Sequence, residues 1–361
     1  DRQTDRQTDR QTDRQTDRLC KENTDGLRGL LAMGILAHHL FQYSGCLRGT
    51  AFATVLQAIG YLSVAEFFFL SGYGLSMSYE KKRDEYIRKF PKEKILPFYL
   101  VILILTVGWV IIKIFFHERI TMSTIGKSLL FGETVIEGGW YLQVQLLLYI
   151  IWFIAFKSHG ADSQKLIHLT IIELLYCGAM IGLGYSTTWY ESVMAFPIGI
   201  VWAEHRFDID DRFQSFGQWI KVEMILFILF VTAFGVSHII PFEFARIVAK
   251  MISAVLFVAL LTLTIYKISL SCKIARFLGN ISLEIYTMQF VFLTLFHGLW
   301  INIEIPYLYI VCVVLATCFA AALFKTIVNK IYKVCSYNCN CYNYNYKLYI
   351  FYYCHFYILY V

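Results

Sequence analysis

Residues 26–45 read "GLRGLLAMGILAHHLFQYSG" and place one arginine and two histidines in an otherwise apolar stretch. A helix of about 20 apolar residues is long enough to cross the hydrocarbon core of a bilayer. Ionisable side chains are costly at membrane depth, so those found there are candidates for a function. The stretch therefore predicts a membrane helix that carries reactive groups.

The whole chain is short of charged residues. It has 361 residues, of which 58% are hydrophobic and 16% are charged, whereas soluble domains have about 25% charged residues. We predict an all-α, polytopic bundle of about ten transmembrane helices. The expected spans are residues 27–43, 54–77, 95–116, 140–156, 166–184, 187–203, 219–237, 247–266, 278–299 and 306–324.

Basic residues concentrate in alternate connections between these spans. The connection after the second span reads "YEKKRDEYIRKFPKEK", and the ones after the fourth, sixth, eighth and tenth spans also carry lysine or arginine. Because basic loops stay on the cytoplasmic side and the number of spans is even, both termini are predicted to be cytoplasmic. The net charge of +6 is thus explained by topology, and no nucleic-acid partner is expected.

The composition divides the chain into three segments. Residues 1–24 are a low-complexity Asp-Arg-Gln-Thr repeat tract that we expect to be disordered, and residues 25–330 form the transmembrane domain. Residues 331–361 are an atypical tail rich in Tyr and Asn, which suggests a non-native reading frame or disorder. No metal site is predicted, because Cys339 and Cys341 are spaced more closely than the cysteines of structural zinc sites.

Arg28 and His39 form the first candidate site. They are eleven residues apart, which on a helix is about three turns and ~16 Å along one face, whereas His38 points about 100° away. An arginine at the cytoplasmic headgroups can hold a phosphate, and a histidine deeper in the bilayer can take a proton from a hydroxyl or carry a group transiently. The alternative is a snorkelling arginine and histidines that bond neighbouring helices.

Glu66 is a second buried candidate. It precedes three phenylalanines in the second expected span, where a carboxylate is expensive unless it has a partner. It could orient His39 or balance Arg28, and the spacing does not choose between them. Ser71 and Gly72 follow it and predict close helix packing.

Five stretches, taken in order, resemble the membrane-bound acyltransferase-3 family. They are the Arg-x10-His pair of the first span, "EFFFLSGYGL" followed by its basic segment, "KILPFY", "GGWYLQVQLLLY" and "GNISLEIYTMQF". The resemblance covers residues 25–330 and implies ten spans. It also implies an enzyme that moves an acyl group, usually acetyl from coenzyme A, onto sugars or other envelope acceptors.

The resemblance implies that Arg28 and His39 are the essential pair, and we predict them, with Glu66, as the catalytic residues. It also implies that Arg88, Lys92 and Lys94 meet the anionic coenzyme. The chain departs from the family at two places. Lysines replace the family's Arg-x-x-Arg before the third span, which favours looser phosphate binding. Gln289 stands where the family has a histidine, so this position is not expected to be the base.

The predicted function is therefore that of an integral membrane O-acetyltransferase in a bacterial inner membrane. Its expected partners are the lipid bilayer, acetyl-CoA from the cytoplasm and the hydroxyl of a cell-envelope glycan or lipopolysaccharide-type acceptor. Two alternatives stay open. One is a transporter or flippase for a lipid-linked or small solute, although the sequence lacks the similar halves of many transporters. The other is a catalytically inactive scaffold.

The repeat in residues 1–18 predicts phase-variable expression. Asp-Arg-Gln-Thr can be encoded by the four-letter unit GACA, which gives the same peptide in all three frames, so gain or loss of one unit shifts everything downstream. Sequencing the tract in sibling clones should find different copy numbers. An invariant copy number, or codons that break the GACA unit, would instead favour a disordered charged linker.

Overall fold

The computed structural model describes residues 18–270 and 272–338, and these residues form helices joined by turns. Within these two ranges there is no strand, and the only pairing of extended residues is the isolated bridge between His297 and Asn302. The predicted all-α class is confirmed for this part of the chain.

The helices have the following bounds. They are α2 (Lys21–Ser44), α3 (Ala51–Phe90), the π-helix η1 (Pro91–Ile95), α4 (Leu96–Phe115), α5 (Met122–Leu129), α6 (Trp140–Lys157), α7 (Asp162–Gly182), the short 3-10 helix η2 (Thr187–Trp189), α8 (Ala195–Glu204), α9 (Arg206–Arg212), α10 (Phe216–Ile239), α11 (Glu243–Ile265), α12 (Lys273–Asn280), α13 (Ser282–Leu295) and α14 (Pro306–Asn338).

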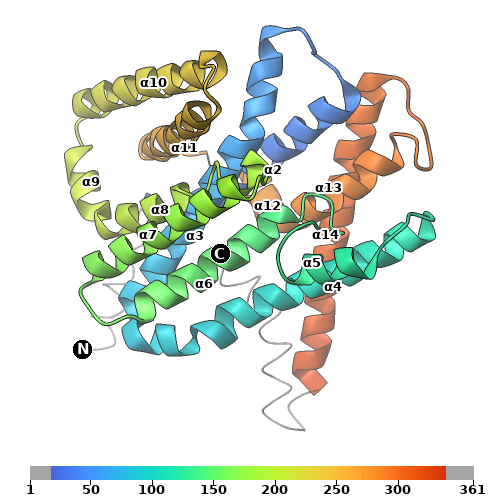
Figure 1. Ribbon diagram of the computed structural model, residues 1–361, viewed down its shortest axis with the longest axis horizontal. Coiled ribbons are helices and arrows are strands. Elements are labelled where there is room, and N and C mark those ends of the chain that lie inside the picture. Colours follow the sequence, from blue (N-terminus) through green and yellow to red (C-terminus); the bar gives the residue numbers. More distant parts are fainter. Residues whose placement is uncertain (1–17, 271, 339–361) are drawn as a thin grey trace.

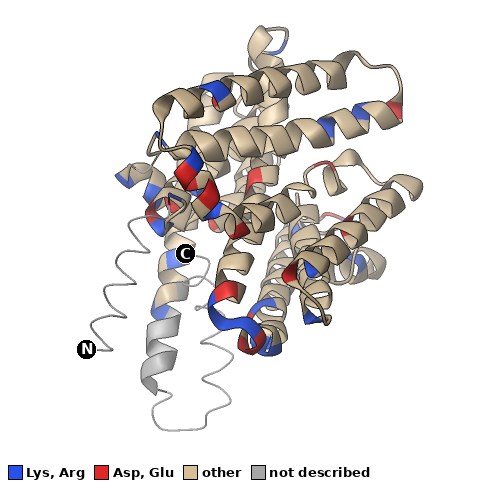
Figure 2. Ribbon diagram, turned by 90° about the vertical axis from the view of Figure 1, so that its left-hand side faces the viewer, with Lys and Arg blue, Asp and Glu red and all other residues tan. Residues whose placement is uncertain are grey.

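Long apolar helices support a multi-pass integral membrane protein. Within the described residues, six helical stretches are long and apolar enough to cross a bilayer, namely Ala51–Phe115, Trp140–Lys157, Asp162–Gly182, Phe216–Ile239, Glu243–Ile265 and Pro306–Ile327. The first stretch contains both α3 and α4, so it takes in two of the expected spans. Charged residues gather near the turns, whereas long stretches of helix have none (Figure 2).

The expected count of ten spans is not confirmed. Residues 187–203 hold the 3-10 helix η2 and most of α8, which has only 10 residues, and residues 278–299 hold α13, which has 14. A 10-residue helix is about 15 Å long, half the thickness of the hydrocarbon core. The number of crossings and the cytoplasmic placement of the termini therefore stay predictions.

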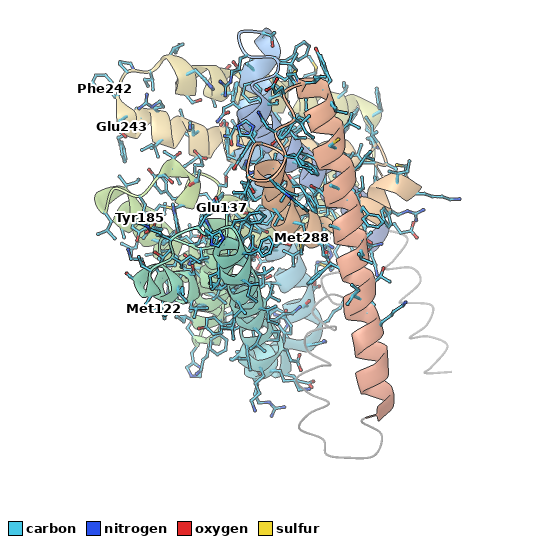
Figure 3. All side chains as sticks on the ribbon, turned by 90° about the vertical axis from the view of Figure 1, so that its right-hand side faces the viewer. Met122, Glu137, Tyr185, Phe242, Glu243 and Met288 are labelled. Carbon is cyan, nitrogen blue, oxygen red and sulfur yellow. The ribbon has the colours of Figure 1, made fainter. Side chains whose placement is uncertain are left out.

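The helices pack around α2 and α3. Helix α8 lies against α3, whereas α12 and α13 lie against α2. Helices α10 and α11 form a pair on one side, and α14 lies on the opposite side (Figure 1). Figure 3 shows Phe242 and Glu243 at the turn between α10 and α11, away from α14, which packs along α13.

Two helices run across the predicted segment boundaries. Helix α2 begins at Lys21, before the expected start of the domain at residue 25, and α14 continues past residue 330 to Asn338. Residues 1–17 of the repeat and residues 339–361 of the tail lie outside the described residues.

Helices α2 and α12 touch at their backbones. A β-carbon on Gly29 would lie 2.1 Å from the carbonyl oxygen of Ala275, and one on Gly279 would lie 1.8 Å from that of Asp25. Both distances are too short for any other residue, so glycine is required on each helix. Because Arg28 is next to Gly29, this contact fixes the arginine beside the corner between α12 and α13.

Replacing Gly279 by alanine tests this contact. Gly279→Ala should push α12 away from α2 and lower the free energy of unfolding by roughly 1–3 kcal/mol, as overpacked substitutions do. The measurement is the thermal unfolding of the full chain in detergent. The matched control is Gly178→Ala in α7, where a β-carbon meets nothing within 4 Å. Equal melting temperatures for Gly279→Ala and the parent would contradict the packing.

Candidate active site

A cavity of about 130 Å³ lies between α2, α3, α4, α6, α14 and the corner of α12 and α13. Arg28 and Lys325 line the cavity together with Glu284 and Asn280. The remaining wall is largely apolar and aromatic and includes Ile35, Phe67, Leu70, Phe98, Tyr141 and Tyr149. The cavity therefore offers both positive charge and an apolar surface.

Arg28 reaches the cavity from the second turn of α2. Its side chain is 18% exposed, and its Nη1 lies 3.4 Å from Oδ1 of Asp25 on the preceding turn. The sequence had suggested Glu66 as a possible counter-charge for this arginine and had overlooked Asp25. The pair could have been found from its spacing, since residues three apart on a helix are neighbours.

Lys325 and Glu284 join α14 to α13 at the cavity. Lys325 Nζ lies 3.3 Å from Glu284 Oε1, and the side chain of Glu284 is 1% exposed. A carboxylate this deeply buried needs a cation close by. Sequence reasoning gave Glu284 no role and took Lys325 only as part of the topology pattern. The spacing between these two residues carries no signal that they meet.

His39 lies one turn beyond the inner end of the cavity. Ile35, four residues earlier on α2, lines the cavity, and the ring of His39 packs against Phe290 of α13 with centroids 4.5 Å apart. Nδ1 of His39 lies 3.2 Å from Oε1 of Gln42. The structure thus places Arg28 beside the cavity and His39 further along the same helix, in the order that the spacing predicts.

Two segments that are far apart in the sequence meet at the inner end of the cavity. The hydroxyl of Tyr286, which lines the cavity, donates to the carbonyl oxygen of Gly138. A β-carbon on Gly138 would lie 2.5 Å from the ring of Phe290, so this ring rests directly on the glycine. The turn before α6 is therefore in contact with the helix whose Phe290 packs on His39.

His38 has a structural environment. Its Nδ1 lies 2.9 Å from the carbonyl oxygen of Leu56. A β-carbon on Gly60 would lie 2.7 Å from its ring, so the ring fills the space that this glycine leaves on α3. The two adjacent histidines therefore differ in their surroundings, since His38 contacts α3 and His39 contacts α13.

Glu66 is fully buried and faces α11. The hydroxyl of Thr262 donates to its Oε1 over 3.3 Å, and its Oε2 has no hydrogen-bond partner in the described part of the chain. Neither the pair of Arg28 with Asp25 nor the contact of His39 with Gln42 involves this carboxylate. A catalytic role for Glu66 stays a prediction.

The basic segment after the second expected span is helical rather than a loop. Helix α3 continues to Phe90 through a kink at Arg83, where φ is +45°, and the Arg83 guanidinium lies 2.6 Å from Oδ2 of Asp162 at the start of α7. This ion pair joins the ends of α3 and α7.

The three residues expected to meet the coenzyme have different positions. Arg88 and Lys92 are exposed, whereas Lys94 is 7% exposed and lies in the π-helix between α3 and α4. Lys94 is one turn before Phe98, which lines the cavity. Among the described residues that line the cavity, the cations are Arg28 and Lys325 rather than these three.

Within residues 18–270 and 272–338 there is no group of three or more His, Cys, Asp or Glu side chains placed to hold a metal ion.

Comparison with known proteins identifies a family. The sequence model of a family described as an acyltransferase domain matches residues 22–326, a range that includes the cavity and His39. No curated protein and no solved structure matches the chain.

The pair of Lys325 and Glu284 provides a test of the cavity wall. Lys325→Met should lower the free energy of unfolding by roughly 3 kcal/mol, because it leaves a buried carboxylate without this cation. The double variant Lys325→Met/Glu284→Gln should recover most of that loss, which unfolding in a graded detergent series can measure. The two side chains would not be paired if the loss of unfolding free energy in the double variant equalled the sum of the losses in Lys325→Met alone and Glu284→Gln alone.

Proposed function

Because this chain belongs to the acyltransferase-3 family of membrane proteins, we propose that it moves an acetyl group from cytoplasmic acetyl-CoA to a hydroxyl of a cell-envelope glycan. The resemblance noted for residues 25–330 is confirmed by the family match, and with it the broader identification as a membrane acyltransferase. The observation that carries the finer proposal is the cavity that begins at Arg28 and ends one turn before His39.

The two ends of the cavity suit the two ends of an acyl-CoA molecule. Arg28 and Lys325 can bind phosphate groups, and the planar guanidinium can do so through two parallel hydrogen bonds. The apolar and aromatic wall suits the thiol arm and the acyl group. This orientation would direct the thioester toward the inner end, where Ile35 and Tyr286 lie next to the turn that carries His39 and Phe290.

His39 is then positioned to act as the base. When Nδ1 of His39 carries the ring proton, it donates a hydrogen bond to Gln42 Oε1, and Nε2 keeps a free lone pair. On this proposal Nε2 takes the proton of the acceptor hydroxyl while the hydroxyl oxygen bonds to the acetyl carbon. The carbon–sulfur bond breaks, and the thiolate receives the proton from His39, so the products are an acetyl ester and free coenzyme A.

A second route with the same products has His39 carry the acetyl group itself, from the thioester to the acceptor. In both routes the acceptor reaches His39 from the end of the bundle opposite to Arg28.

The proposal places the Arg28 end of the bundle at the cytoplasmic face of a bacterial inner membrane. The basic residues from Lys81 to Lys94, among them the exposed Arg88 and Lys92, lie in the last turns of α3 and in η1. Because α3 runs antiparallel to α2, they lie at the same end of the bundle as Arg28. Basic residues favour the cytoplasmic face and would attract the anionic coenzyme toward the mouth of the cavity. The repeat in residues 1–18 would then switch a surface modification on and off.

The two adjacent histidines give a matched test. Mass spectrometry should find O-acetyl groups on the envelope glycans of cells with the gene and none in cells that lack it. His39→Ala should abolish acetylation at unchanged protein level, whereas His38→Ala should have a much milder effect because His38 contacts α3 rather than the catalytic region.

Two results would contradict the proposal. One is full acetylation with His39→Ala. The other is unchanged acetylation in cells that lack the gene together with altered pools of lipid-linked precursors, which would indicate transport.

A further inference from the structure

Gln145 of α6 is a buried amide that points to a ligand. It lines the cavity, is 2% exposed, and its Nε2 has no hydrogen-bond partner among the described residues. Buried polar groups in folded proteins nearly always have a partner. An amide that keeps two unused N–H donors at the wall of a cavity therefore suggests that a ligand supplies the acceptor.

The orientation of this amide is fixed by Ser71. The Ser71 hydroxyl donates to Oε1 of Gln145 over 3.1 Å, and both side chains line the cavity. Ser71 is itself held in place by its neighbour Gly72, since a β-carbon there would lie 2.1 Å from the carbonyl oxygen of Phe196 in α8. Because the amide oxygen is engaged, the NH₂ group is the part of Gln145 that can bind a ligand.

The surroundings of Gln145 select the kind of acceptor. The walls of the cavity near it, on α3, α4 and α6, carry Phe67, Phe98 and Tyr149, and such surfaces suit an uncharged part of a ligand. Arg28 and Lys325 are the groups in the same cavity that would bind its anionic part. An N–H donor between aromatic walls matches a neutral carbonyl oxygen, and the thiol arm of an acyl-CoA has such oxygens in its two amides and its thioester.

We infer that Nε2 of Gln145 donates a hydrogen bond to a carbonyl oxygen of the thiol arm of the acyl donor. This inference rests on the proposed function, because it assumes that the cavity holds the donor. Gln145 is then a binding residue that fixes how far the arm enters the cavity, and hence how close the thioester comes to the turn that carries His39.

Binding measurements on the full chain in lipid nanodiscs test the inference without an acceptor. The probes are acetyl-CoA, coenzyme A, and adenosine 3′,5′-bisphosphate, which has phosphates but no thiol arm. Gln145→Met should raise the Kd of acetyl-CoA about tenfold, the effect of losing one such hydrogen bond. It should leave the Kd of the bisphosphate unchanged.

Coenzyme A identifies the carbonyl. An equal loss of affinity for coenzyme A would assign the hydrogen bond to an amide of the arm, and a loss for acetyl-CoA alone would assign it to the thioester. If Gln145→Met does not fold, Gln145→Asn is the second variant. It keeps the amide but withdraws it by one methylene, and it should raise the Kd of acetyl-CoA in the same way.

Gln143 is the matched control on the same helix. It is also buried, but its amide binds the end of α5 through the carbonyl oxygens of Lys127 and Ser128 and the following loop through the N–H of Gly132. Gln143→Met should therefore lower the melting temperature and leave all three affinities unchanged. The inference is overturned if Gln145→Met binds acetyl-CoA as tightly as the parent, or if Gln143→Met loses as much affinity. If the parent protein binds none of the probes, the proposed function is overturned together with the inference. This result differs from the two outcomes above, in which the parent binds acetyl-CoA.

Discussion

The backbone contact between α2 and α12 is the constraint on which the rest of the site depends. In a bilayer, lipid tails are as apolar as the helix surfaces, so helices are held by close packing at small residues. Gly29 and Gly279 allow that approach, and Gly72 and Gly199 do the same for α3 and α8. With α2 fixed in this register, Arg28 faces the cavity and His39 meets α13 further along.

The charges of the site are arranged along this frame. Arg28 pairs with Asp25, and Lys325 pairs with Glu284, so each cation at the cavity has a carboxylate beside it. Such pairing lets positive charge exist in an apolar bundle and leaves both cations at the cavity wall, where an anionic ligand can bind them. The polar groups deeper in the cavity are uncharged amides and hydroxyls, as at Gln145 and Ser71.

Much of the fold and part of the site could be predicted from the sequence. The length and composition of the apolar stretches predict a helical membrane protein, and the periodicity of one helix predicts that Arg28 and His39 lie along one run of α2. Composition does not say where a turn interrupts an apolar stretch, and so α8 and α13 were expected to be full spans. Contacts between distant segments, such as Lys325 with Glu284 or Glu66 with Thr262, leave no trace in linear spacing.

The position of a bound donor would test the central claim most directly. We predict that cryo-electron microscopy of the full chain in nanodiscs with coenzyme A would show the phosphates at Arg28 and Lys325. The thiol should lie at the inner end of the cavity, next to Tyr286 and the turn that carries His39. Density for the coenzyme outside this cavity, or with its phosphates at the inner end, would contradict the claim.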